Sequence, residues 1–85
     1  MTNEEIVRAL KQRLNEEGNA WNLSFEVSTR YKPDGEWTQF FVSSDANRTN
    51  SAAERQIISD VETDLIKEAG REILIIHSPE IIDAA

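Results

Sequence analysis

The sequence predicts an α+β fold, a two-layer α/β sandwich in which two helices cover one face of a three-stranded mixed sheet. The predicted order is α-β-β-α-β with a short C-terminal helical turn. Three observations support this: two segments carry apolar residues at helical spacing, one stretch alternates apolar and polar residues, and four aliphatic residues run together over 73–76. At 85 residues, the chain is expected to form a single domain over 1–85.

The first helix is predicted over residues 3–17. Thr2 and Glu5 have the spacing of a capping box, in which the hydroxyl accepts from a free N–H of the first turn and the carboxylate reaches back. An apolar stripe then follows at helical spacing, formed by Ile6, Val7, Leu10 and Leu14. Gly18 is placed to end the helix.

The next two strands are predicted to form a hairpin. Residues 21–31 alternate apolar and polar side chains, which is the pattern of a strand with one face on the core and one toward solvent. The core-facing set of this strand would be Trp21, Leu23, Phe25, Val27, Thr29 and Tyr31. Residues 32–35 contain Pro33 and Gly35 and favour a turn. Residues 36–44 then return as the second strand.

The second half of the chain is predicted as a helix over about 52–69 and a strand over 71–77. Ser51 and Glu54 have the spacing of a second capping box. Because this helix connects the second and third strands, those two strands are expected to run parallel. Residues 78–80, Ser-Pro-Glu, predict the N-cap of the short C-terminal turn.

The second and third strands carry more large apolar residues than one sheet face needs. One hairpin register, in which Tyr31 pairs with Trp37, turns Phe40 and Val42 away from the helices. The predicted outer surface is then formed by Phe40 and Val42 with Leu74 and Ile76 of the third strand. In a register shifted by one residue, Trp37 and Phe41 face outward in place of Phe40 and Val42. Such a face needs a cover. We expect a second protein molecule, most simply a second copy in a homodimer, or the C-terminal tail through Ile81 and Ile82.

Candidate catalytic and metal-binding residues are few. The chain has no cysteine and one histidine, His77. A general base is one interpretation of His77, but we favour a rim histidine that hydrogen-bonds a backbone carbonyl. Asp60, Asp64 and Glu68 share one edge of the second helix, where a solvated face is favoured over a cation site. The sequence therefore predicts a non-enzymatic protein with no cofactor, no metal and no evident small-molecule substrate.

The charge and hydropathy of the chain limit which classes of partner it can have. The net charge is −7, which disfavours nucleic acid because affinity for phosphates comes from Lys and Arg. The N-terminus lacks the apolar core of a signal peptide. The longest aliphatic run, residues 73–76, is far shorter than the ~20 residues that span a bilayer. We expect a small acidic cytoplasmic protein without a membrane partner, acting as an interaction module for itself or another protein.

An alternative function comes from a resemblance. Residues 53–58 followed by residues 73–80 are similar to the helix and final strand of the BolA-like proteins, and the element order is similar to a reduced type II KH arrangement. The resemblance implies a binding or regulatory module that contacts nucleic acid or an assembly factor. This chain has Arg55-Gln56 where the family has an Arg-His pair, whose histidine is linked to iron–sulfur partnerships, and it lacks the GxxG loop of KH domains. The alternative predicts a concentrated basic patch and loss of binding on Arg55→Glu.

Overall fold

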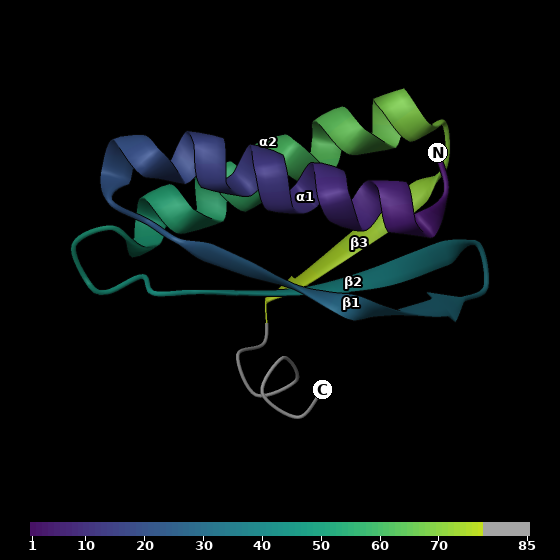
Figure 1. The fold of residues 1–85 in the computed structure, drawn as a ribbon, viewed down its shortest axis with the longest axis horizontal. Helices are drawn as coiled ribbons and strands as arrows, with labels where there is room; N and C mark the ends of the chain where they lie inside the picture. The colour runs from purple at the N-terminus through teal and green to yellow at the C-terminus, as the bar shows by residue number, and fades with distance from the viewer. Residues whose placement is uncertain (78–85) are drawn as a thin grey trace.

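A computed structural model describes residues 1–77 and has the predicted element order (Figure 1). The elements are helix α1 (Asn3–Gly18), the 3-10 helix η1 (Asn19–Trp21), strands β1 (Phe25–Asp34) and β2 (Trp37–Ser44), helix α2 (Ser51–Ala69) and strand β3 (Glu72–His77). Both helices lie on one face of the sheet (Figure 1). The predicted α+β class is therefore confirmed, whereas the predicted turn at 78–80 lies outside the described residues.

The three strands form one mixed sheet in the order β1-β2-β3. Strands β1 and β2 pair antiparallel as a hairpin, and β2 and β3 pair parallel. The parallel pairing confirms the expectation from the helical crossover between β2 and β3. Strand β2 is central, so β1 and β3 are both edge strands.

The hairpin register decides which face each side chain of β2 occupies. Val27 lies opposite Val42, and Tyr31 lies opposite Phe40. Phe40 and Val42 are completely buried, so the prediction that they face outward is wrong. Trp37, which the shifted register placed outward, is indeed exposed. Strand alternation places Phe41 on the same outer side as Trp37.

The difference in register comes from the turn. The hairpin closes through Gly35 and Glu36 alone, because Asp34 already pairs with Trp37. Gly35 has a φ of +64°, a conformation that favours glycine. Pro33, which was expected in the turn, lies inside an edge strand, where a residue without an N–H is tolerated. Moving the turn changed the pairing by an odd number of residues and so exchanged the two faces of β2.

The start of β1 also differs from the alternating pattern. Trp21 ends η1 instead of opening the strand and is 56% exposed. Asn22, with a φ of 55°, reverses the chain direction before the strand begins. The pairing then shifts between Val27 and Tyr31, a β-bulge that buries Ser28 and interrupts the alternation.

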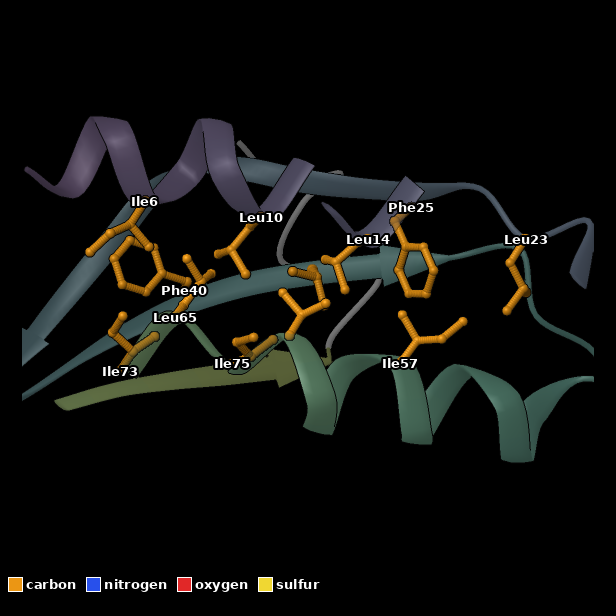
Figure 2. Close-up of a cluster of buried hydrophobic side chains, with 12 residues drawn as sticks. Ile6, Leu10, Leu14, Leu23, Phe25, Phe40, Ile57, Leu65, Ile73 and Ile75 are labelled. Carbon is orange, nitrogen blue, oxygen red and sulfur yellow. The ribbon is translucent and has the colours of Figure 1, made fainter. Parts of the chain in front are cut away.

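A single apolar core fills the space between the helices and the sheet (Figure 2). Its twelve buried members are Ile6, Leu10, Leu14, Leu23, Phe25, Phe40, Val42, Ile57, Val61, Leu65, Ile73 and Ile75. The Tyr31 ring packs against that of Phe40, with centroids 5.9 Å apart. Every predicted apolar position of the first helix stripe except Val7, which is half-buried, lies in this core.

Arg71 ties the start of β3 to the start of α1. Its guanidinium donates to Asn3 Oδ1 at 2.6 Å and to Thr38 Oγ1 at 2.7 Å, and it lies 3.4 Å from the carbonyl oxygen of Met1. Thr38 is buried on the helix side of the sheet. The Arg71 charge is therefore directed toward the helices and away from the opposite face.

The capping box at the start of α1 is confirmed, and it predicts that the stability of the fold depends on pH through Glu5. The Thr2 N–H donates to Glu5 Oε1 at 2.8 Å, and the Glu5 N–H donates to Thr2 Oγ1 at 3.1 Å. The bond from the Thr2 backbone lowers the pKa of Glu5 below its ordinary value of 4.5. A lowered pKa means that this contribution to stability is complete above about pH 4.5 and is lost as the pH falls through the folded-state pKa.

We expect Glu5→Gln to be less stable than the wild type at pH 7, by a difference that becomes smaller as the pH falls into the acidic range. The reason is that protonated Glu5 no longer presents the carboxylate that the Thr2 N–H binds. Urea unfolding of both proteins at pH 7 and pH 3 measures this. A stability difference that is the same at both pH values would contradict the role given to the ionised carboxylate.

Candidate interaction surface

The face of the sheet opposite the helices, here called the outer face, carries four apolar side chains on β2 and β3. Trp37 is 43% exposed and Leu74 is 37% exposed, and Phe41 and Ile76 are half-buried. Within residues 1–77 no element covers this face, because both helices lie on the other side (Figure 1). Leu74 and Ile76 thus face outward as predicted, joined by Trp37 and Phe41 in place of Phe40 and Val42.

Strand pairing arranges the outer face in rows across the sheet. The row next to the hairpin turn is Asp34, Trp37 and Glu72, the next is Lys32, Gln39 and Leu74, and the third places Phe41 beside Ile76. Directly opposite residues lie on the same face, which assigns these charged side chains to the outer face. Trp37 therefore lies between two carboxylates. The other apolar side chains, Leu74, Phe41 and Ile76, lie farther from the hairpin turn on β2 and β3.

Both edges of the sheet are partly occupied by helix side chains. The Phe25 N–H in β1 donates to Asn15 Oδ1 at 2.8 Å, and Asn15 Nδ2 donates to the Phe25 carbonyl at 3.1 Å. On β3, the Ile75 N–H donates to Glu62 Oε2 at 2.8 Å. Occupied edge groups hinder pairing with a further strand. Asn15 and Glu62 were missed in the sequence because each resembles an ordinary polar residue on the solvent side of a helix.

His77 contacts a buried carboxylate and not the backbone carbonyl that was expected. Its Nε2 lies 3.2 Å from Glu54 Oε2, and Ser44 Oγ donates to the same oxygen. Glu54 is only 7% exposed. The predicted capping box with Ser51 is therefore wrong: α2 begins after Asn50 without a side-chain cap, and Glu54 points toward the strand ends.

The Glu54 contacts indicate a structural role more readily than a catalytic one. Ser44 and His77 both contact the carboxylate, and no hydrogen bond joins the serine hydroxyl to the imidazole, as a nucleophile and base pair requires. The Ala46 N–H also donates to Ser44 Oγ, at 3.2 Å. Glu54 thus connects the end of β2, the end of β3 and the first turn of α2.

The acidic edge of α2 is solvated, as predicted. Asp60, Asp64 and Glu68 are all exposed. Glu68 pairs with Arg13 of α1, with Nη2 and Oε1 2.8 Å apart, and this bond raises the pKa of Arg13 and lowers that of Glu68. Gln56 Nε2 donates to Asp60 Oδ1 at 2.8 Å. Among the described residues, no three His, Asp or Glu side chains are grouped to hold a metal ion.

Two open grooves lie beside β1. One, of about 370 Å³, is lined by residues of polar types, namely Ser24, Glu26, Ser43, Ser44 and Asp45. The other, of about 210 Å³, lies between α1 and β1 and is lined by Glu4, Val7, Arg8, Thr29 and Tyr31. The Tyr31 hydroxyl donates to Glu4 Oε1 at 3.0 Å across the second groove.

Comparison with known proteins adds no function. No family model matches the chain, and no curated protein or solved structure is significantly similar to it. In the part of the chain that the structure describes, neither helix is long and apolar enough to cross a membrane. The function is therefore inferred from the geometry of the outer face.

Proposed function

We propose that the protein is a small non-enzymatic protein–protein interaction module whose contact surface is the outer face. The observation that supports this is the apolar half of that face, where Trp37 and Leu74 are exposed and no described element covers them. Contiguous exposed apolar side chains mark interaction surfaces. Tryptophan is enriched among the residues that contribute most to binding energy.

The edges of the sheet favour contact through the outer face over pairing with a further strand. The charges on that face favour a protein partner over nucleic acid. Asn15 and Glu62 occupy backbone groups at the two edges, so addition of a further strand is hindered. Strand pairing and alternation place three acidic side chains, Glu26, Asp34 and Glu72, and two basic ones, Arg30 and Lys32, on the outer face, whose charge is therefore not positive. This balance disfavours a nucleic-acid surface, and no observation favours the KH- or BolA-like alternative.

The contact surface is tested by photo-crosslinking in cells that produce the protein. A photoreactive phenylalanine derivative at position 74 of the outer face is compared with the same derivative at position 63, on the exposed side of α2. We expect crosslinked products from position 74 and not from position 63. A product of twice the mass identifies a second copy, and any other mass identifies a different protein. Products in equal amounts from both positions, or from neither, would contradict the proposal.

A homodimer was the partner expected first from the sequence, and the solution mass distinguishes it from binding of a different protein. If two outer faces pair, light scattering across a concentration series should show a dimer for the wild type and a folded monomer for Ile76→Glu. The interface would be at the low end of the roughly 1,200–2,000 Å² of stable complexes, because β3 has only six residues. Thr63→Glu, on the exposed side of α2, is the matched control and should behave like the wild type. A wild type that stays monomeric throughout excludes the homodimer.

A further inference from the structure

We infer that the row formed by Asp34, Trp37 and Glu72 binds a cationic side chain, an arginine or lysine, of a partner protein other than a second copy of this chain. The inference rests on the proposed function, because it names the chemistry of the partner for the same outer face. It begins from the position of an exposed indole between two carboxylates.

Strand pairing places these three side chains within reach of one ligand group. Asp34 lies opposite Trp37 across the antiparallel pair, and Glu72 lies opposite Trp37 across the parallel pair. Neighbouring strands are about 4.8 Å apart. A guanidinium or ammonium group above the indole would therefore meet a carboxylate on either side. Indole attracts cations through its ring face, and carboxylates bind guanidinium through paired hydrogen bonds.

The two carboxylates are not neutralised within the described residues. The Glu72 side chain makes no hydrogen bond or ion pair there, and the Asp34 side chain has one long contact, in which Oδ2 lies 3.4 Å from Gln39 Nε2. Lys32, one row away, pairs with neither carboxylate. Arg71 is held on the helix side by Asn3 and Thr38. The row thus presents two negative charges to any protein that approaches the outer face.

The other apolar residues of the outer face indicate which side chains of the partner lie next to its cationic group. Phe41, Leu74 and Ile76 lie one and two rows farther along, which corresponds to roughly 7 and 13 Å at the rise of a strand. A matching partner presents apolar side chains at that distance from its basic residue.

A second copy is the poorer match because it brings the same acidic row and a net charge of −7. Charge complementarity therefore selects a basic protein.

The inference is tested by NMR titration with capped tripeptides. The first probe is acetyl-Arg-Ala-Leu-amide, and the second carries citrulline, a neutral isostere, in place of arginine. We expect saturable shifts of the Trp37 indole N–H and of the Asp34 and Glu72 amides with the arginine peptide. Binding of the citrulline peptide should be at least tenfold weaker, in line with the cost of losing a charged contact. Added salt should weaken only the arginine peptide.

Matched variants assign the effect to the row. Asp34→Asn combined with Glu72→Gln should reduce arginine-peptide binding to the citrulline level. Asp60→Asn combined with Asp64→Asn, which removes two exposed carboxylates from α2, should leave it unchanged. Equal binding of the two peptides to the outer face would overturn the cation site while the contact surface stands. Arginine-peptide shifts confined to α2, or their absence from the outer face, would also overturn the cation site. The proposed function fails separately, when position 74 gives no selective crosslink.

Discussion

Phe40→Ala is expected to lower the free energy of unfolding by about 3–5 kcal/mol, whereas Phe41→Ala is expected to lower it by about 1 kcal/mol. The two phenylalanines are adjacent in sequence but lie on opposite faces of β2. Phe40 is completely buried and packs against Tyr31, so its truncation leaves a cavity. Phe41 is half-buried on the outer face, so its truncation removes less contact with the rest of the chain.

Urea unfolding at pH 7 followed by circular dichroism measures both variants. Stabilities of small domains lie near 5–15 kcal/mol, so Phe40→Ala removes a large fraction of the total and can leave too little folded protein to measure. Phe40→Leu, which removes less volume, keeps the comparison measurable and should still cost more than Phe41→Leu. The reverse order would mean that the hairpin pairs in the other register and that Phe40 faces outward.

Asn15→Ala is expected to lower the free energy of unfolding by about 2 kcal/mol or more, because it leaves two backbone groups of Phe25 without partners. The higher helix propensity of alanine offsets part of that cost, by roughly 0.5 kcal/mol. The exposed edge of β1 should also make the variant more prone to association through strand pairing. Urea unfolding measures the first effect, and light scattering measures the second.

Gln12→Ala is the matched control on the same helix. Gln12 also has a side-chain amide in a hydrogen bond, to Glu16 Oε1 at 3.0 Å, but both residues are exposed. Its removal is expected to change the stability by about 0.5 kcal/mol or less. If the two variants lost the same stability, the amide of Asn15 would have no special role at the sheet edge.

The candidate site could be predicted in part from the sequence. The excess of apolar residues on β2 and β3 indicated an apolar outer face, and Leu74 and Ile76 belong to it in either hairpin register. The choice between the pairs Phe40 and Val42 or Trp37 and Phe41 depends on the parity of the pairing. A turn that moves by an odd number of residues reverses that parity, and local turn propensity around Pro33 does not determine where the turn closes.

The contacts of Glu54 and Asn15 depend on residues distant in the chain. Glu54 has the spacing of a capping residue for α2, and its carboxylate instead binds Ser44 and His77 once packing brings the ends of β2 and β3 to the first helical turn. Asn15 binds Phe25 only because the C-terminal part of α1 packs next to the start of β1. Neither contact has a periodic or local signal in the sequence.

The sequence by itself determined the two helices, the three strands, their order along the chain and the parallel crossover, because these follow from apolar period and connection length. Only the tertiary structure decided the hairpin register, the side chains at the sheet edges and the position of Trp37 between Asp34 and Glu72. The physical reason is that local propensities depend on residues close together in the sequence. The strand register and the edge contacts depend on which side chains are buried when distant segments pack into one core.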